Sequence, residues 1–283
     1  MAAYKGVIVL ASIWLSVVYI HQVTGSEVPH HEHGETQTQW AIYKSKPNDK
    51  WSYYGAEATL AVYSYPYLKA DRSTAGLIGV LYGQRGPRDQ FNAILVGWTV
   101  DPKFYGDSLA RFFISWTADA DRKTGCFDLR CEGFRSLNGA VITPGDVVDP
   151  LSTGKGNQSD ITFRIFKDQI SGDWWLYYGQ YDNLSPVGYF PKTLFGGLAD
   201  RADQIYFGGH VSFLKGGVSP PMGNGHSLGD GPAYFKGVQY VGQNGQKYLP
   251  DELRDYVDNK DCYQVSYFVY DTFHYGGPGG CTN

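Results

Sequence analysis

The chain has 283 residues and a formal net charge of −4, and only 18% of its residues are charged, below the roughly 25% of an average domain. Aromatic residues make up 16%, glycine and proline are frequent, and only six of the 28 acidic residues are glutamate. Aromatic residues favour strands and glutamate favours helices, so the composition excludes a helical bundle or coiled coil. An acidic chain without a basic block also argues against nucleic-acid binding.

The N-terminus predicts export. A basic residue precedes an apolar run from Val7 to Ile20, which is about as long as a signal-peptide core and shorter than the roughly 20 residues of a membrane span. Small residues before Ser26 suit cleavage. We expect a signal peptide over 1–25, a loose polar leader over 26–38 and a single domain over 39–283. A membrane anchor is the alternative interpretation of the apolar run.

Four cysteines lie beyond the expected signal peptide. An even number in an exported chain predicts two disulfides, for which three pairings are possible. Pairing Cys126 with Cys131 and Cys262 with Cys281 closes the shortest loops, at the lowest cost in entropy. A zinc site is the alternative, but the spacing lacks the paired Cys-x-x-Cys pattern of such sites.

Two sequons, at Asn157 and Asn183, are candidate glycosylation sites in an exported chain. Pro186 follows the second sequon and makes it the weaker acceptor. Three histidines and a glutamate between His30 and His33 could bind copper or nickel weakly, but a solvated tail is the favoured interpretation. We therefore expect no resident metal and no cofactor.

From Trp40 onward, short apolar and aromatic runs alternate with turn clusters, at spacings of about 10–15 residues that are typical of a sandwich. The run from Ile161 to Phe166 alternates in polarity, as a strand with one wet face does. The pattern predicts an all-β fold, an antiparallel sandwich of two sheets, with short helical turns at 191–198 and 250–255. The expected strands are 54–65, 75–82, 91–100, 110–117, 162–167, 174–181, 204–213, 233–241 and 264–272.

Motifs of common hydrolases and nucleotide-binding proteins do not stand out. The chain contains neither Gly-x-Ser-x-Gly nor His-Glu-x-x-His, and the glycine-rich stretch at 276–280 does not follow the strand-to-helix pattern of a phosphate loop. The body contains three scattered histidines: His210, His226 and His274. Three of the six glutamates lie in the body: Glu57, Glu132 and Glu252.

Specific strings, in order and at consistent spacing, resemble the neprosin family of secreted plant proteins. The resemblance extends from about Trp51 to Cys281. The matching strings include YGAEAT from Tyr54, GWTVDP from Gly97, YGD from Tyr105, RFFISWTAD from Arg111, TGCFDLRC from Thr124, VGYFP from Val187, MGNG from Met222 and YGGPG from Tyr275.

The resemblance implies a sandwich of two antiparallel sheets with a cleft on its concave face, and it implies the two short-range disulfides. Active members look like glutamic peptidases that cut beside proline at acidic pH. One carboxyl acts as general base on a water, and a second, protonated carboxyl acts as the acid. Active members also carry a long N-terminal activation domain, whereas about a dozen residues separate the expected cleavage site from the body here.

The family's two catalytic glutamates correspond here to Leu95, two residues before a Gly-Trp pair, and to His210, directly after a Gly-Gly pair. Leucine has no titratable proton, and a histidine would be positively charged at acidic pH. The resemblance therefore implies that no catalytic dyad is intact. The nearest acids in the sequence are Asp101, Asp107 and Asp203, and strand spacing does not favour a dyad rebuilt from them.

Two functions remain. In the first, the protein is a non-catalytic relative of proline-cleaving glutamic peptidases that binds a proline-rich peptide or a cell-wall glycan in its cleft, with no nucleic-acid partner and no membrane span. The alternative is an active secreted hydrolase with rearranged catalytic residues. The candidate binding residues are Trp98, Tyr105, Trp116 and Tyr206, with His210 as a polar group. Each aromatic taken singly is more often a core residue.

Overall fold

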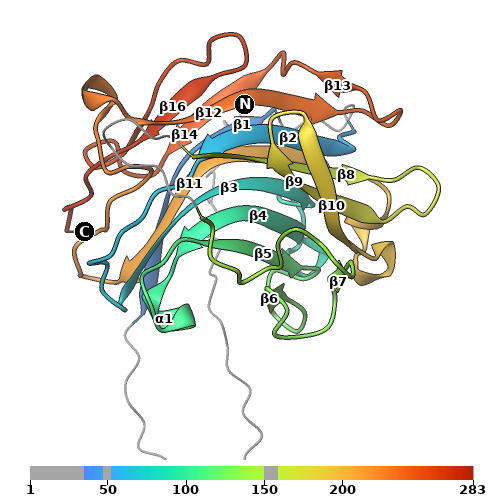
Figure 1. Ribbon diagram of the computed structural model, residues 1–283, viewed down its shortest axis with the longest axis horizontal. Helices are drawn as coiled ribbons and strands as arrows, with labels where there is room; N and C mark the ends of the chain where they lie inside the picture. Colours follow the sequence, from blue (N-terminus) through green and yellow to red (C-terminus); the bar gives the residue numbers. More distant parts are fainter. Residues whose placement is uncertain (1–34, 47–51, 150–158, 283) are drawn as a thin grey trace, which may run out of the picture.

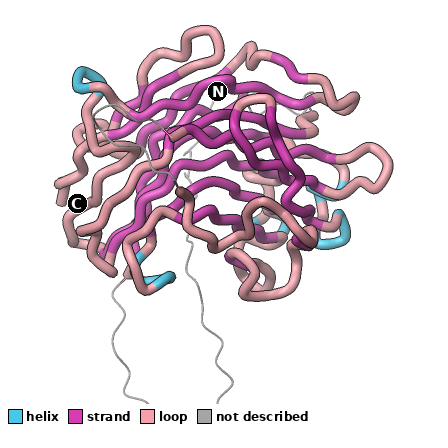
Figure 2. Tube along the Cα trace, in the orientation of Figure 1, coloured by secondary structure: helices cyan, strands magenta, loops and turns pink. Residues whose placement is uncertain are grey.

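The computed structural model describes residues 35–46, 52–149 and 159–282. Within these residues strands dominate, and Figure 2 shows them as long runs beside a few short helical turns. All strand pairs are antiparallel and form two sheets, which Figure 1 shows as stacked layers. The all-β sandwich expected from the sequence is confirmed. The expected signal peptide, Asn157 and the segment from His30 to His33 lie outside the described residues.

The first sheet has seven strands, and its interior strand β4 is mostly apolar. All nine residues of β4 are buried, because both faces of this sheet are covered by other side chains. In spatial order the strands are β14 (Leu253–Val257), β1 (Thr36–Ser45), β11 (Gln204–Leu214), β3 (Arg72–Tyr82), β4 (Asn92–Val100), β5 (Arg111–Thr117) and β6 (Cys126–Phe127).

The second sheet has nine strands. Its order is β15 (Gln264–Val265), β16 (Phe273–Gly276), β12 (Ala233–Val241), β2 (Gly55–Ala61), β8 (Asp160–Lys167), β9 (Trp174–Gln180), β10 (Asn183–Phe190) and β7 (Arg135–Ser136), with β13 (Lys247–Tyr248) paired to β12. The helical turns are α1 (Pro102–Tyr105), η1 (Arg88–Gln90), η2 (Lys192–Leu194), η3 (Gly197–Ala199) and η4 (Leu228–Asp230). The turns η2 and η3 confirm the helical signal at 191–198.

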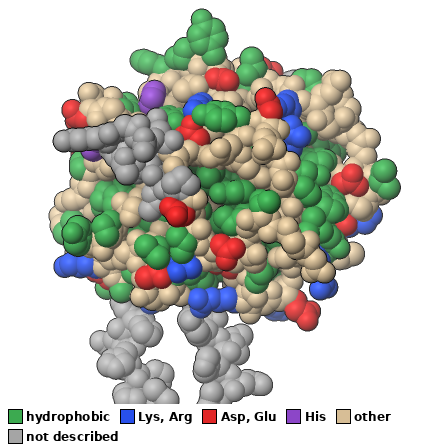
Figure 3. Space-filling model, viewed as in Figure 1, with side chains coloured by type: hydrophobic (Ala, Val, Ile, Leu, Met, Phe, Trp, Pro, Cys, Tyr) green, Lys and Arg blue, Asp and Glu red, His purple; other side chains and the backbone are tan. Residues whose placement is uncertain are grey.

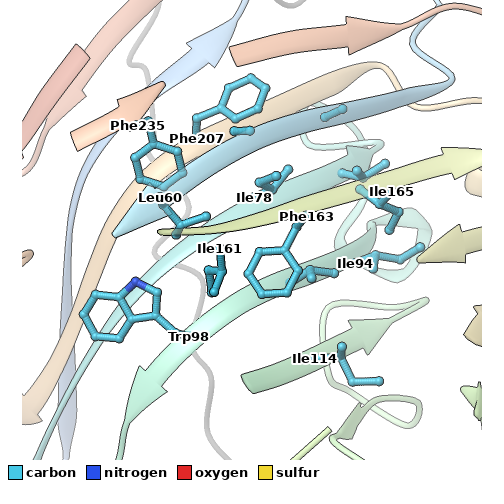
Figure 4. Close-up of a cluster of buried hydrophobic side chains, with 14 of the residues drawn as sticks. Leu60, Ile78, Ile94, Trp98, Ile114, Ile161, Phe163, Ile165, Phe207 and Phe235 are labelled. Carbon is cyan, nitrogen blue, oxygen red and sulfur yellow. The ribbon is translucent and has the colours of Figure 1, made fainter. Parts of the chain in front are cut away.

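The main core lies between the two sheets. Successive side chains of a strand point to opposite faces, so Ile161, Phe163 and Ile165 of β8 face this core while Arg164 lies on the other face and is only half-buried. Figure 4 shows these three side chains among apolar residues contributed by the opposing sheet. The alternation seen in the sequence of β8 therefore marks which face is buried.

Two sequence-based boundaries are wrong for the same reason. Residues 36–38, assigned to the loose leader, belong to β1 because Thr36 pairs with Leu214 of β11. Residues 250–255 do not form a helical turn, because Leu253–Val257 is strand β14 and pairs along the other edge of β1. Pairing partners distant in sequence thus determine the structure of both segments, and local propensity does not report them.

Strand prediction also fails around a turn near the C-terminus. Of the expected strand 264–272, only Gln264–Val265 is strand, and the chain turns before β16 begins at Phe273. Strand β10 is absent from the sequence prediction. It contains Pro186 and has an irregular register between Pro186 and Gly188, so its sequence does not carry the regular alternation of a strand.

Both predicted disulfides are confirmed, because Cys126 is bonded to Cys131 and Cys262 to Cys281. All four cysteines are thus paired, and no free cysteine remains as a ligand for the alternative zinc site. Among residues 35–46, 52–149 and 159–282, no group of acidic, histidine and cysteine side chains could hold a metal ion. No helix in the same ranges is long and apolar enough to cross a membrane.

A glycine in β4 provides a test of how tightly the first sheet is packed. A Cβ atom added at Gly97 would lie 2.0 Å from the carbonyl oxygen of Gly76 on β3. We expect Gly97→Ala to lower the free energy of unfolding by about 3 kcal/mol or more, because backbone cannot move aside as a side chain can. Gly229→Ala, where no atom lies within 4 Å, is the matched control. Equal stability of the two variants in chemical denaturation would contradict this packing.

Candidate functional site

The seven-stranded sheet carries a second apolar cluster on the face that points away from the inter-sheet core. We call this the outer face, and its cluster the outer-face cluster. It is built by side chains of β1, β3, β4, β5 and β11 that alternate with those facing the inter-sheet core. Its members are Trp40, Ile42, Ala75, Leu77, Leu81, Phe91, Ala93, Leu95, Phe113 and Tyr206.

Leu95 lies at the centre of this cluster. Its neighbour across the β3–β4 pair is Gly79, which in turn pairs with Tyr206 of β11. A Cβ atom on Gly79 would lie 3.1 Å from a methyl group of Leu95 and 3.3 Å from Cβ of Tyr206, so the leucine side chain extends over the glycine. Only 5% of Leu95 is exposed. Glycine at position 79 thus makes room for the leucine.

His210 lies on the same face, on β11, and is 6% exposed. It pairs with Trp40 of β1, and the two ring centroids are 4.3 Å apart with the planes tilted by 49°. The Nε2 atom of His210 is buried and has no hydrogen-bond partner among the described residues. Burial lowers the pKa of His210 to about 4. The imidazole is therefore neutral at all but strongly acidic pH, contrary to the expectation of a positive charge.

The sequence resemblance assigns Leu95 and His210 to the two dyad positions. In the structure these two residues do not face each other across an open cleft. The pair Gly79–Leu95 and the pair Ala75–His210 lie four residues apart along β3, which corresponds to roughly 13 Å along the strand. Strand β3 also separates the two residues. Both side chains are buried because the surrounding face is filled by large apolar groups.

Two of the predicted binding residues are on the wrong face. Trp98 follows Leu95 by an odd number of residues and therefore points into the inter-sheet core, where its exposure is 0%. Figure 4 draws it there among buried side chains. Trp116 of β5 also belongs to the inter-sheet core and packs edge-on against Phe195 at 5.9 Å. Neither tryptophan lines a site with Leu95 or His210.

The two predicted tyrosines lie in different places. Tyr206 belongs to the outer-face cluster, and its hydroxyl donates to Oε1 of Gln204 at 3.2 Å. Tyr105 lies at the end of α1, and its hydroxyl donates to Oδ2 of Asp128 at 2.6 Å. Tyr206 is thus the only predicted aromatic residue that the described structure brings to the same face as Leu95 and His210.

The acids nearest to the dyad positions in the sequence have structural roles. Asp101 caps α1 by accepting from the amide of Phe104 at 3.1 Å. Asp107 accepts from the guanidinium of Arg111 at 2.6 Å, and this hydrogen bond lowers the pKa of its carboxyl. Oδ2 of Asp203 accepts a hydrogen bond of 2.8 Å from the amide of Gly83, in the turn after β3. Burial raises the pKa of the Asp203 carboxyl. These contacts account for all three carboxylates.

Two of the three glutamates of the body form ion pairs. Glu57 is buried on β2 of the other sheet, where its carboxylate is paired with Arg164 at 2.5 Å and with Lys247 at 2.9 Å. Glu252 is paired with Lys46 at 2.8 Å. Glu132 is exposed and follows the disulfide-bonded Cys131.

Sequence analysis missed the residue that contacts His210 most directly. Trp40 begins the apolar part of β1, and its main-chain amide donates to Oδ2 of Asp258 at 2.8 Å. Tyr256 of β14 donates to the other oxygen of the same carboxylate, so this acid anchors the edge of the sheet. The sequence does mark Trp40 as an aromatic residue at the start of an apolar run. Nothing in the sequence, however, links Trp40 to His210.

The fold is a two-sheet antiparallel β-sandwich, and Leu95 and His210 lie on the outer face of its seven-stranded sheet. A model of the Neprosin family matches residues 72–278, which is more than half of the chain. The chain therefore belongs to the Neprosin family. Strands β3, β4 and β11, which carry Leu95, His210 and the residues between them, lie within the matched range.

Solved structures of glutamic peptidases are similar in fold to this chain. Scytalido-glutamic peptidase with a transition state analog inhibitor is 10% identical with a TM-score of 0.48, and the match covers 86% of this chain and 99% of that chain. SCP-B, a member of the Eqolisin family of peptidases in a complex with the tripeptide Ala-Ile-His, is 10% identical with a TM-score of 0.43 and the same coverage.

The lowered pKa of His210 predicts a dependence of stability on pH. The unfolded chain takes up a proton below about 6.5, whereas the folded chain does so only below about 4. Stability conferred above pH 6.5 is therefore lost as the pH falls towards 4, by up to about 3 kcal/mol. We expect His210→Leu to remove this part of the acid sensitivity in chemical denaturation. His226→Gln, at an exposed imidazole, is the control that should retain it.

Asp128 provides a test of opposite sign. Burial raises the pKa of its carboxyl to about 6, although hydrogen bonds from Tyr105 and the amide of Ile114 act against this. The folded chain holds a proton that the unfolded chain releases, so stability falls as the pH rises from about 4 to about 6. We expect Asp128→Asn to gain stability relative to wild type across this range, by about 2–3 kcal/mol. Asp107→Asn should instead lose stability at neutral pH.

Proposed function

We propose that the protein is a secreted, non-catalytic member of the Neprosin family that binds a proline-containing peptide on the outer face of its seven-stranded sheet. One observation carries the proposal. Leu95 and His210, which the sequence resemblance assigns to the family's two catalytic glutamates, are both buried, and neither side chain is a carboxyl. The same face carries the aromatic residues Trp40 and Tyr206.

Peptide hydrolysis by two carboxyls needs groups that can accept and donate a proton near the pH of the reaction. Leu95 can do neither. His210 has a pKa of about 4 because it is buried, so its imidazole is a poor base at any pH above that value. These properties support a protein that holds a peptide without cleaving it.

The same residues favour a peptide as the ligand. The buried Nε2 atom of His210 has no partner among the described residues, and an unpaired buried polar atom costs about 1–3 kcal/mol. A main-chain group of a bound peptide would supply the missing hydrogen bond. Trp40 contacts the His210 ring on this face, and the ring centroids of Trp40 and Tyr206 are 6.5 Å apart. A proline ring packs well against aromatic faces.

Secretion is supported by the cysteines. Two disulfides and no unpaired cysteine are typical of proteins that fold in an oxidising compartment. The expected signal peptide agrees with this compartment. Together they support a protein that meets its ligand outside the cell.

We expect purified mature protein to leave proline-containing peptides intact from acidic to neutral pH, because no proton-exchanging pair is present. Cleavage would be followed by mass spectrometry of the products. Cleavage by the wild type that is lost in His210→Ala would overturn the proposal and identify an active hydrolase. The double variant Leu95→Glu and His210→Glu asks whether the two carboxyls alone restore activity.

Binding forms the second part of the test. We expect a proline-rich peptide to bind the wild type in calorimetry and to bind His210→Leu about fivefold more weakly, which corresponds to one lost hydrogen bond of about 1 kcal/mol. His226→Gln is the control for the loss of an imidazole elsewhere. Equal affinity of His210→Leu and wild type would contradict the assignment of this face.

A further inference from the structure

Two tyrosines protrude from the turn between β15 and β16. Tyr267 is 90% exposed and Tyr270 is 88% exposed. In Figure 3 hydrophobic side chains protrude from the upper edge of the molecule, where Figure 1 draws the turn that leads into β16. Single exposed apolar residues need no explanation, but large rings gathered on one turn point to a binding surface.

The turn is held in one conformation by its own hydrogen bonds. Val269 and Thr272 exchange two main-chain hydrogen bonds, of 2.9 Å and 3.0 Å. The amide of Ser266 donates to the carbonyl of His274 at 2.8 Å, and the amide of His274 donates to the Ser266 hydroxyl at 2.9 Å. Tyr270 adopts a positive φ of 57°, which a bulky residue adopts only when its surroundings impose it.

The turn is also fixed to the body of the protein. Phe268 points inward and packs against Tyr43 of β1, with ring centroids 5.7 Å apart. The hydroxyl of Tyr43 donates to the carbonyl of Ser266 at 2.7 Å. With Phe268 inside, the neighbouring Tyr267 is held outside. Its ring therefore presents a flat surface without the usual loss of loop entropy on binding.

A pocket of about 470 Å³ lies along this turn, within the range of small-ligand sites. Its wall combines large apolar groups with hydroxyl, carboxylate and imidazole groups. The lining residues are Ser266, Tyr267, Val269, Tyr270, Asp271, Thr272 and His274. The imidazole of His274 therefore belongs to this wall, although its Nδ1 atom is buried and has no hydrogen-bond partner among the described residues.

The exposed surface of this pocket is mostly apolar with few polar groups, a composition that suits the C–H face of a sugar ring. A pyranose ring has faces of C–H groups, which are attracted to the negative faces of aromatic rings, and an edge of hydroxyls that exchange hydrogen bonds with carboxylate and imidazole. An acidic sugar is disfavoured, because the pocket contains Asp271 and the chain has a net charge of −4. The chemistry therefore selects a neutral sugar.

We propose that the turn from Ser266 to His274 is a binding site for a neutral oligosaccharide, with Tyr267 and Tyr270 stacking on sugar rings and Asp271 and His274 bonding to hydroxyls. The site is separate from the outer face of the seven-stranded sheet, because its residues belong to the β15–β16 edge of the other sheet. It does not depend on the peptide binding proposed above.

The test is affinity electrophoresis of the purified mature protein in native gels that contain soluble polysaccharides. Xyloglucan and galactomannan are the neutral probes, and homogalacturonan is the acidic probe. We expect a neutral polysaccharide to retard the wild type and homogalacturonan to leave its mobility unchanged. We further expect Tyr267→Ala and Tyr270→Ala each to weaken binding at least tenfold, because each removes a stacking ring.

Tyr67→Ala is the matched control, because Tyr67 is 94% exposed and lies outside the pocket. Unchanged thermal unfolding of the three variants shows that loss of binding is not loss of fold. The proposal is overturned if neither neutral polysaccharide retards the wild type, or if Tyr67→Ala weakens binding as much as Tyr270→Ala does. His210→Leu should leave the retardation unchanged, so failure of this site and failure of the peptide site are distinguishable.

Discussion

The seven-stranded sheet is covered on both of its faces, and the other features of the molecule depend on this. Strand β4 contributes Trp98 to the core between the sheets and Leu95 to the outer-face cluster. A carboxyl at position 95 would be placed among apolar side chains, where burial disfavours its charged form. Leucine fills the space above Gly79 instead. The packing that stabilises the sheet therefore favours an apolar residue at position 95.

A histidine lies on this largely apolar face, together with the buried polar residues Ser115 and Gln204. His210 is tolerated because its imidazole can be buried in the neutral form, which costs far less than burying an ion. Its contact with the Trp40 ring replaces part of the lost hydration. The remaining unpaired nitrogen distinguishes this position from an ordinary core residue, for which hydrophobic side chains would serve equally well.

Much of the fold could be predicted from the sequence, because the strands with regular alternation, such as β8, report their own burial. The disulfides followed from the shortest loop closures. Strand β14 could not be predicted, since its pairing with β1 depends on a partner more than two hundred residues away in the chain. For the candidate site, strand parity alone places Trp98 and Leu95 on opposite faces of β4, whereas the burial of Leu95 and His210 depends on neighbouring strands. The aromatic turn before β16 carried no motif at all.

Strand β1 contributes to both the outer face and the inter-sheet core. Trp40 contacts His210 on the outer face, whereas Tyr43, three residues later, packs in the core and donates to the carbonyl of Ser266. A slip of β1 by one residue would turn both side chains to the opposite face. An insertion or deletion inside β1 would therefore disturb two remote surfaces at once. The length of this ten-residue strand is thus constrained, even though the family model begins only after it.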